Sequence, residues 1–409
     1  MEHICVVGLG YIGLPTAVTL ALGGFSVCGA DIQPAVVETL RTGRAPIAEP
    51  GLDEALAAAL ASGRLTFSCE TPEADAFIIT VQTPHLTRSD GVRAADLRFV
   101  ESAARDVAAR LKPGNLVVLE STVPPGTCRR LEAWLAAGSG LAADEFHVAH
   151  CPERVIPGRI LRELAENDRI VGARTEAAAH LACGLYRRVA TKGRLRVADD
   201  ITAEMCKLVE NTFRDVNIAY ANELSRVADK LGIDVFRLIE LANCHPRVNI
   251  LSPGVGVGGH CIAVDPWFIH GLFPDDTPLI AAARRVNDQK PLLVADAVQR
   301  RLSPGARVCV LGLAYKPDID DLRESPSLTL CRALRARGVS VAACEPHAAA
   351  VVDGFDNVPF EAALSYDFLV LAVGHTLFKE RRADIAARPH HDCVGILSND
   401  KAGILSIDK

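Results

Sequence analysis

The chain has 409 residues, more than one ordinary hydrophobic core accommodates, and this predicts roughly two or three domains. Hydrophobic residues make up 49% and charged residues 23%, a balance typical of globular proteins and not of disordered or fibrous ones. With 44 Lys and Arg against 50 Asp and Glu, the net charge of -6 argues against nucleic acid as the main partner.

Short apolar runs alternate with helical segments through the first half of the chain. Strands are predicted at residues 3–8, 25–31, 76–82, 116–121 and 146–151, and helices at 11–22, 52–62 and 97–111. Strands separated by helices predict an α/β fold with a parallel, doubly wound, Rossmann-like sheet. Turns rich in Gly, Pro, Ser or Thr follow these strands, at the edge where open α/β sheets bind ligands.

The pattern changes after residue 200. Residues 201–232 contain no Pro and no Gly before Gly232, and their apolar residues recur at helical spacing, which predicts one long amphipathic helix. Further helices are predicted at 234–242, 277–286 and 327–337, and strands at 308–313, 339–344 and 368–373. We therefore predict an N-terminal Rossmann-like domain (1–199), a central helical domain suited to homodimerisation (200–299) and a C-terminal Rossmann-like α/β domain (300–409).

Residues 3–30 carry no charged side chain and are long enough to span a bilayer. Six glycines and the lack of a basic flank favour a buried strand–helix–strand unit instead. Thirteen cysteines without a C-x-x-C pair are typical of reduced thiols. The cluster His390-His391-Asp392-Cys393 has no second ligand pair at a suitable spacing, so we expect no metal site. We expect a cytoplasmic protein that does not insert into membranes.

A glycine-rich turn, Val7-Gly-Leu-Gly-Tyr-Ile-Gly13, follows the first predicted strand and opens a helix. Gly8 permits a tight turn, Gly10 lets backbone approach a pyrophosphate, and Gly13 allows helix and strand to pack. Asp31 ends the next strand, where its carboxylate would bind the adenosine ribose and repel a 2′-phosphate. NAD is therefore expected in preference to NADP; the alternative is a Rossmann fold kept without its cofactor.

Lys207, Asn211 and Arg214 share one face of the long predicted helix. A solvated face is the ordinary explanation, but apolar residues and not acidic partners flank this stripe. Residues 253–266 then form a loop with four glycines before Cys261, which would let backbone approach a ligand closely. Cys261 is either an inert thiol or a nucleophile, which an ammonium group such as that of Lys207 would activate.

Several motifs that occur in order along nearly the whole chain carry a family resemblance. They are Val7-Gly-Leu-Gly-Tyr-Ile-Gly-Leu-Pro15, Glu120-Ser-Thr-Val-Pro-Pro-Gly126, Cys151-Pro-Glu-Arg154, Glu204-Met-Cys-Lys-Leu-Val-Glu-Asn211, Gly258-Gly-His-Cys261 and Lys316-Pro-Asp-Ile-Asp-Asp-Leu-Arg-Glu-Ser-Pro326. With these motifs the chain resembles the nucleotide-sugar 6-dehydrogenases. The resemblance implies an NAD-dependent enzyme that oxidises the C6 alcohol of a UDP-hexose to a carboxylate.

The resemblance also implies a four-electron mechanism. Cys261 would add to the intermediate aldehyde as a thiohemiacetal, because an aldehyde gives a second hydride only after a nucleophile makes its carbon tetrahedral. A thioester would follow, and water assisted by Glu153 would release the acid. Lys207 and Asn211 would donate hydrogen bonds to the developing oxyanion, and Asp265 would hold Lys207 and the attacking water.

Binding residues follow from the same resemblance. The cofactor would contact Gly8, Gly10, Tyr11, Ile12, Gly13, Asp31, Thr83, Thr122 and Arg323. The UDP-sugar would contact Arg154, Val155, Lys207, Asn211, Arg214, His245, Arg247, Gly258, Tyr315 and Lys316. His245 and Arg247 are candidates to act across a homodimer interface, and the C-terminal domain would bind the UDP portion. Thr122 is a further catalytic candidate, and capping its Pro-Pro turn is an equally good explanation.

Segments 213–218, 245–250 and 261–268 are most similar to the branch of the family that oxidises UDP-N-acetyl-D-mannosamine for bacterial surface polysaccharides. UDP-N-acetyl-D-glucosamine and UDP-glucose are alternatives, although Ala263 stands where the UDP-N-acetyl-D-glucosamine enzymes usually have proline. A two-electron hydroxyacid dehydrogenase would need neither Cys261 nor a third α/β block. A nucleotide-sensing protein without catalysis would need none of the proposed catalytic residues.

Overall fold

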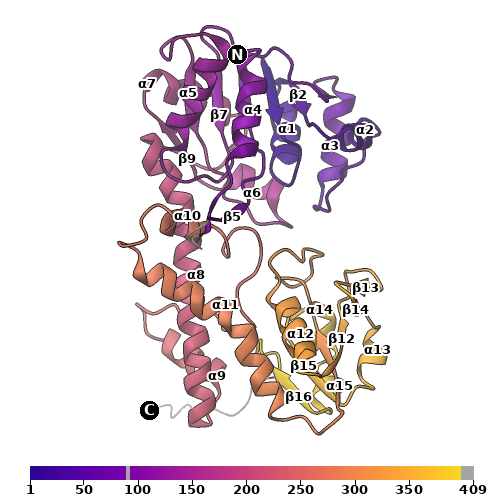
Figure 1. The fold of residues 1–409 in the computed structure, drawn as a ribbon. Helices are drawn as coiled ribbons and strands as arrows, with labels where there is room; N and C mark the ends of the chain where they lie inside the picture. The colour runs from indigo at the N-terminus through magenta and orange to yellow at the C-terminus, as the bar shows by residue number, and fades with distance from the viewer. Residues whose placement is uncertain (89–92, 398–409) are drawn as a thin grey trace, which may run out of the picture. The chain divides into compact units, whose positions relative to one another are not determined.

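The computed structural model describes residues 1–88 and 93–397. The chain divides into two compact units (Figure 1). One contains Met1–Glu210 with Trp267–Leu272, and the other contains Asn211–Pro266 with the described residues from Phe273 onward. The helices α8 (Asp200–Leu231) and α10 (Asp265–His270) each contribute residues to both units.

The first unit is built on an eight-stranded sheet with the order β10-β9-β8-β7-β4-β1-β2-β3. Its strands are β1 (His3–Val7), β2 (Ser26–Ala30), β3 (Leu65–Ser68), β4 (Ala76–Ile79), β7 (Leu116–Leu119), β8 (His147–His150), β9 (Arg169–Ala173) and β10 (Leu195–Ala198). Neighbouring strands are parallel except for β8 and β9, which are antiparallel. The predicted α/β class and the five predicted strands of this half are confirmed.

Helices cover both faces of this sheet (Figure 1). They are α1 (Gly13–Leu22), α2 (Pro34–Arg41), α3 (Leu52–Ala61), α4 (Arg98–Ala108), α5 (Thr127–Ser139), α6 (Ile160–Glu166) and α7 (Glu176–Tyr186). Alternate residues of β1 enter two cores, with Ile4 and Val6 on one face and Cys5 and Val7 on the other. This two-sided burial explains the uncharged N-terminal run, which forms β1, α1 and β2 as predicted.

A short antiparallel hairpin, β5 (His85–Thr87) with β6 (Arg93–Ala95), belongs to the same unit. The guanidinium group of Arg93 lies over the ring of Trp267 in α10, with 5.3 Å between its carbon and the ring centroid. No helix among the described residues combines the length and the apolar character that crossing a membrane requires.

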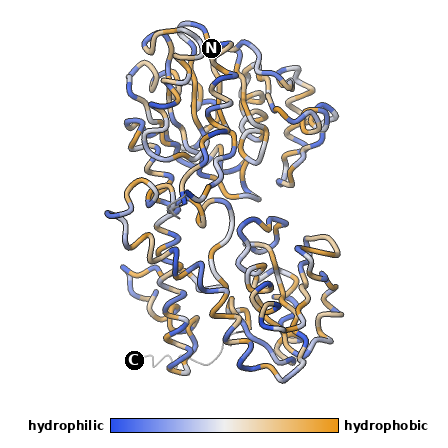
Figure 2. Tube along the Cα trace, in the orientation of Figure 1, coloured by the Kyte–Doolittle hydropathy of each residue, from blue (hydrophilic) through white to orange (hydrophobic). Residues whose placement is uncertain are grey.

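The long helix predicted after residue 200 is confirmed as α8, which ends just before Gly232. Hydrophobic and hydrophilic residues alternate along it (Figure 2). It is followed by α9 (Val235–Asn243) and α11 (Pro278–Gln299). The prediction for α11 was too short, because the helix continues through Pro291 to residues that pack in a core, Val294, Ala295 and Val298. Tertiary burial here outweighs the usual helix-ending effect of proline.

The C-terminal block of the second unit has a parallel four-stranded sheet with the order β12-β11-β15-β16. Its elements are β11 (Arg307–Leu311), α12 (Pro326–Ala336), β12 (Ser340–Cys344), the hairpin β13 (Val351–Val352) and β14 (Phe355–Asp356), α13 (Phe360–Ala363), β15 (Phe368–Leu371), α14 (Thr376–Glu380), α15 (Arg382–Ala386) and β16 (His390–Asp392). The His-His-Asp-Cys segment forms β16 and its end. The Asp392 carboxylate accepts hydrogen bonds from three following backbone N–H groups, and Cys393 is buried in the core.

Candidate active site

The glycine turn between β1 and α1 has the geometry of a phosphate-binding turn. Gly8 has φ +92°, and its N–H donates to the Ala30 carbonyl over 2.8 Å. A Cβ atom on Gly13 would lie 1.8 Å from the Gly8 carbonyl oxygen, so only glycine fits there. A Cβ atom on Gly10 would meet no protein atom within 4 Å. The exposed turn at the N-terminus of α1 is therefore suited to a pyrophosphate.

Asp31 follows β2 beside this turn. One of its carboxylate oxygens accepts a hydrogen bond from the Leu9 N–H and the other from the Gln33 N–H, each over 2.9 Å. The carboxylate thus ties the end of β2 to the glycine turn and remains half-buried at the ligand-binding edge. The next residue, Ile32, is 77% exposed and offers an apolar surface beside the carboxylate. These residues fit the adenosine half of NAD.

The turns after β4 and β7 meet at the same edge of the sheet. The Thr83 hydroxyl donates to the Thr122 carbonyl over 2.7 Å, and the Ser121 hydroxyl donates to the Val81 carbonyl over 2.6 Å. The structure therefore brings together Thr83 and Thr122, two residues that the sequence predicts separately as cofactor contacts. Tyr11 and Ile12 are half-buried on the neighbouring glycine turn.

Glu204 connects the first turns of α8 to the turn that follows Thr122. Its carboxylate accepts hydrogen bonds from the N–H groups of Gly126 (2.6 Å) and Cys128 (2.7 Å), at the start of α5. Burial raises the pKa of this carboxyl, and the two N–H donors oppose that rise. Glu204 was not predicted as a functional residue. Local pattern offers no separate signal for it, because Lys207 at i+3 is an ordinary helical partner for an acidic residue.

Lys207 lies one turn after Glu204 and is 8% exposed. Among the described residues, none accepts a hydrogen bond from its ammonium group. A buried ammonium group with unused donors can stabilise negative charge on a bound molecule. The position therefore suits the predicted role of Lys207.

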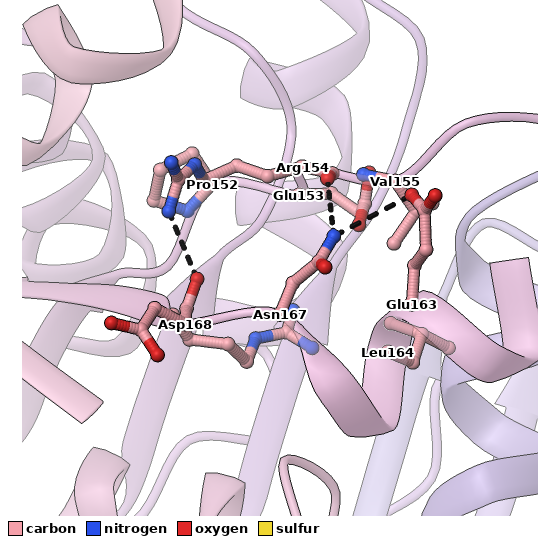
Figure 3. A pocket seen from close by; sticks show the side chains of 9 residues that line it. Pro152, Glu153, Arg154, Val155, Glu163, Leu164, Asn167 and Asp168 are labelled. Atoms are coloured by element: carbon pink, nitrogen blue, oxygen red, sulfur yellow. Dashed lines mark hydrogen bonds between the residues drawn. The ribbon is translucent and has the colours of Figure 1, made fainter. Parts of the chain in front are cut away.

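A small pocket lies next to the end of β8 (Figure 3). It is lined by Pro152, Glu153, Arg154, Val155, Glu163, Leu164, Asn167, Asp168 and Arg169. Glu153 is 6% exposed, and one of its carboxylate oxygens accepts a hydrogen bond from the Val155 N–H over 2.7 Å. The Asn167 side chain donates to the carbonyl of Arg154 and to the Glu163 carboxylate.

Arg154 already has protein partners at this pocket. Its guanidinium group forms an ion pair with Glu210 at 2.5 Å and donates to the Asp168 carbonyl over 2.9 Å. A diphosphate that used Arg154 would have to share it with Glu210. The side chain of Val155 is half-buried and packs against a core of the first unit.

In the second unit, polar side chains of α8 connect to the first residue of α10. The Asn211 amide nitrogen donates to the Asp265 carboxylate, and the Arg214 guanidinium donates to the Asn211 amide oxygen. Asn211 is fully buried and Asp265 is 3% exposed. The carbonyl of Cys261 accepts the N–H groups of Val264 (3.0 Å) and Asp265 (2.8 Å), so the cysteine and the aspartate share one turn.

The glycines before Cys261 make room for other parts of the protein. A Cβ atom on Gly258 would lie 2.7 Å from Pro326 Cδ and 2.8 Å from Tyr315 Cβ. Gly259 has φ +82°, and its N–H donates to the Arg323 carbonyl over 3.0 Å. Packing against the 315–326 segment therefore already requires glycine at these two positions, and close approach of a ligand to the loop stays a prediction. That packing brings together Gly258, Tyr315 and Arg323.

The other predicted substrate contacts lie nearer the surface. His245 and Arg247 are exposed in the turn that follows α9, where the His245 ring accepts the Arg247 N–H over 3.3 Å. Lys316 is half-buried after β11. These exposed groups are available to an anionic ligand or to a partner subunit.

Three sequence models of one family match the chain in order. The NAD binding domain of the UDP-glucose/GDP-mannose dehydrogenase family matches residues 2–190, the central domain matches 201–289, and the UDP binding domain matches 309–398. The chain belongs to this family. NAD is its cofactor, in agreement with the prediction, and the glycine turn with Asp31 fits that cofactor. The protein is an NAD-dependent dehydrogenase with a domain for binding UDP.

Named relatives agree with this membership. The chain is 48% identical to an NDP-N-acetyl-D-galactosaminuronic acid dehydrogenase from Ralstonia nicotianae, covering 93% of this chain and 92% of the relative. It is 47% identical to a UDP-N-acetyl-D-mannosamine dehydrogenase from Campylobacter jejuni, covering 83% and 85%. The solved structure of a UDP-D-ManNAc dehydrogenase from Pyrococcus horikoshii matches with TM-score 0.88 and 40% identity, covering 99% of this chain and 98% of that one.

Proposed function

We propose that this enzyme oxidises the C6 hydroxyl of UDP-N-acetyl-D-mannosamine to the carboxylate, in the cytoplasm, for surface polysaccharide synthesis. The buried hydrogen bond between Asn211 and Asp265 supports the proposal most directly, because it joins the turn of Cys261 to α8. Lys207 precedes Asn211 by one helical turn, so the helix presents both donors on one face. The division into domains 1–199, 200–299 and 300–409 is part of the proposal.

The proposed reaction consumes one alcohol, one water and two NAD+, and it yields one carboxylate, two NADH and three protons. NAD, when bound, accepts the hydrides. The Cys261 sulfur adds to the C6 aldehyde after the first hydride leaves, and the thiohemiacetal becomes a thioester when the second leaves. Water then attacks the thioester carbon and gives a proton to Glu153. The carbon–sulfur bond breaks, and the thiolate of Cys261 is restored.

Lys207 and Asn211 act on the oxygen of C6 in this scheme. Each step that changes the geometry at C6 develops negative charge on that oxygen, and donors fixed in a buried site stabilise such charge. Asn211 is held by Arg214 and Asp265, so its amide is already oriented. Replacing Lys207 by alanine is expected to slow both oxidations, by about 2.7–4 kcal/mol in activation free energy.

The choice of sugar follows the resemblance of the chain to enzymes named for UDP-N-acetyl-D-mannosamine, at 47% and 40% identity. A second candidate comes from the Ralstonia relative at 48% identity, whose name points to an N-acetyl-D-galactosaminuronic acid product. UDP-N-acetyl-D-glucosamine and UDP-glucose are further alternatives. All of these share the UDP portion and differ in the hexose.

A substrate panel tests the proposal. Purified enzyme with NAD+ is given the UDP derivatives of N-acetylmannosamine, N-acetylgalactosamine, N-acetylglucosamine and glucose, and NADH and acid are measured together. We expect the highest kcat/KM with UDP-N-acetyl-D-mannosamine and about two NADH per acid, since two hydrides leave one carbon. Faster turnover of another sugar would replace the substrate, and one NADH per sugar would refute the four-electron reaction.

The covalent step is tested at the cysteine. Cys261→Ala should bind both substrates but form no acid, whereas Cys261→Ser should retain a slowly hydrolysed oxygen ester. Cys183→Ala is the matched control, because Cys183 is also a half-buried cysteine outside any disulfide. Full acid production by Cys261→Ala would show that the thiol is structural.

We also propose that the enzyme is a homodimer through α8. This helix leaves five large apolar side chains about half-exposed or more, at Val209, Phe213, Tyr220, Val227 and Leu231. Exposed apolar residues that recur on one helix are typical of an interface. Sedimentation equilibrium should give twice the chain mass, and Tyr220→Glu should shift the equilibrium toward monomer. A wild-type monomer at micromolar concentration would refute this proposal.

A further inference from the structure

A buried polar cluster lies at the strand ends β7, β8 and β9, next to the pocket that Glu153 lines. Its centre is the ion pair between Arg169 and Glu120, with 3.0 Å between nitrogen and oxygen, at side-chain exposures of 6% and 0%. The Tyr186 hydroxyl donates to Glu120 over 2.7 Å, and the Thr16 hydroxyl donates to its other oxygen over 3.3 Å. The Glu120 carboxyl is therefore well supplied with donors.

Arg169 reaches further than this one carboxylate. Its Nε donates to the Cys151 sulfur over 3.4 Å, and its guanidinium carbon lies 4.5 Å from the centroid of the Tyr186 ring. Cys151 is two residues before Glu153, and Arg169 itself lines the pocket. The guanidinium group thus holds the backbone that carries Glu153 as well as the wall of the pocket.

Two cations line the pocket with Glu153, Arg154 and Arg169, and Arg169 is the more deeply buried of the two. Arg154 is committed to Glu210, and the remaining charged groups that line the pocket, Glu163 and Asp168, are acidic. Burial by itself would lower the pKa of Arg169, but its interactions with the Cys151, Glu120, Tyr186 and Glu153 side chains outweigh burial and raise the pKa. Arg169 therefore stays charged.

The Glu120 carboxyl does not fully neutralise the positive charge of Arg169. Burial raises the pKa of Glu120 despite the neighbouring guanidinium, and the charge of Glu153 raises it further. The carboxyl groups of Glu120 and Glu153 thus both interact electrostatically with Arg169. Burying a charged carboxylate at the 6% exposure of Glu153 is costly unless a cation lies near.

We propose that Arg169 is a positioning residue for Glu153: it binds Cys151 and forms part of the pocket wall, and so holds the Glu153 carboxylate in place to take the proton of the water that cleaves the Cys261 thioester. This inference rests on the proposed function. In the step concerned, the water oxygen forms a bond to the thioester carbon, its proton passes to Glu153, and the Cys261 sulfur leaves with the bonding electrons. Arg169 touches none of these atoms and acts through Glu153.

The test separates hydrolysis from hydride transfer. Enzyme is mixed with NAD+ and the best sugar of the substrate panel, and the NADH burst, the steady-state rate and the mass of the intact protein are recorded. For Arg169→Gln we expect a burst of about two NADH per site, a steady state slower by about tenfold or more, and an acyl adduct on Cys261. Glu153→Gln should give the same adduct, and Arg169→Lys should recover part of the hydrolysis rate.

Three control variants accompany Arg169→Gln. Tyr186→Phe removes a hydrogen bond of the same cluster but keeps the cation, so it should lower the melting temperature without causing an adduct. The double variant Glu120→Gln with Arg169→Gln removes both buried charges together and serves if the single variant does not fold. In a Glu153→Gln background, Arg169→Gln should slow hydrolysis no further, because the group it acts through is gone.

The outcomes separate the positioning role of Arg169 from the hydrolytic role of Glu153. An Arg169→Gln enzyme that loses only thermal stability and hydrolyses without an adduct would overturn the positioning role. Equal loss of the burst and of the steady state would overturn it as well, since hydride transfer does not use Glu153. If Glu153→Gln itself formed no adduct while the wild type released acid, the proposed hydrolytic step would fail, independently of Arg169.

Discussion

The side-chain amide of Asn211 donates a hydrogen bond to the carboxylate of Asp265, and both groups are nearly excluded from solvent. Asn211 lies in α8, whereas Asp265 is the first residue of α10 and shares a turn with Cys261. A helix former as poor as asparagine gains nothing from an apolar helix interior. The burial of Asn211 is explained by its hydrogen bond to Asp265, which gives the buried carboxylate a donor.

The first prediction concerns that bond. Asp265→Asn keeps the size of the side chain but removes the charge that orients Asn211, so kcat should fall on the order of 10²–10³-fold. The KM for NAD+ should change little, because the glycine turn and Asp31 are untouched. Initial rates over a range of both substrates measure the two effects. Asp275→Asn, at an exposed position, is the control, and equal rates for the two variants would contradict the prediction.

The second prediction compares two glycines of one turn. Gly13→Ala places a methyl group 1.8 Å from the Gly8 carbonyl oxygen, so the turn must distort at a cost of about 1–3 kcal/mol in unfolding free energy. Gly10→Ala meets no protein atom within 4 Å and should leave unfolding nearly unchanged. Both should weaken NAD+ binding. Denaturant unfolding and cofactor titration of the two variants would separate packing from cofactor contact, and a destabilised Gly10→Ala would refute this explanation.

The third prediction concerns the choice of dinucleotide. Asp31→Ala removes the carboxylate that faces the adenosine ribose and the acceptor of the Leu9 and Gln33 N–H groups. We expect the KM for NAD+ to rise about 10- to 150-fold, since loss of a hydrogen bond to a charged group costs roughly 1.5–3 kcal/mol. The KM for the UDP-sugar should change less. Wild-type enzyme with NADP+ gives the complementary measurement, and similar kcat/KM values for both cofactors would show that Asp31 does not discriminate.

Local signals were sufficient for much of the fold. The turn from Val7 to Gly13 was identified because its glycines follow an apolar strand, and α8 because 31 residues pass without a helix breaker before Gly232. In both places propensity, hydrophobic pattern and turn chemistry agree. The candidate residues Thr83 with Thr122, and Asn211 with Asp265, were named from motifs, and the structure joins each pair.

Long-range packing explains what the sequence alone did not reveal. The C-terminal half of α11 follows Pro291, which by itself predicts a helix end. The edge strand β10 was missed because its residues are at most half-buried and show no clear alternation. Arg169 looks like an ordinary charged residue beside Asp168, and only the fold pairs it with Glu120 in the wall of the pocket that Glu153 also lines. The glycines before Cys261 were noticed, but their neighbour, Tyr315, lies more than fifty residues later.

The fourth prediction is that His150 makes the protein sensitive to acid. This residue ends β8 and is fully buried; neither ring nitrogen makes a well-formed hydrogen bond with the described residues, and a weak interaction with the Leu119 backbone opposes the effect of burial only in part. Burial lowers its pKa to about 3, because a charged imidazole would lose its hydration. Below pH 6.5 the unfolded chain therefore binds a proton that the folded chain does not. Stability should fall as the pH drops from about 6.5 toward 3, by about 1.4 kcal/mol per pH unit from this group.

His150→Leu removes that dependence. Because the ring makes no well-formed hydrogen bond with the described residues, the unfolding free energy of the variant at pH 7 should differ from wild type by less than about 1.5 kcal/mol. Between pH 6.5 and 5 the variant should lose about 1.6 kcal/mol less stability than wild type. Urea unfolding at both pH values, followed by circular dichroism, measures the difference, with His180→Leu on exposed α7 surface as the control. Parallel losses in wild type and His150→Leu would show that the proton is taken up elsewhere.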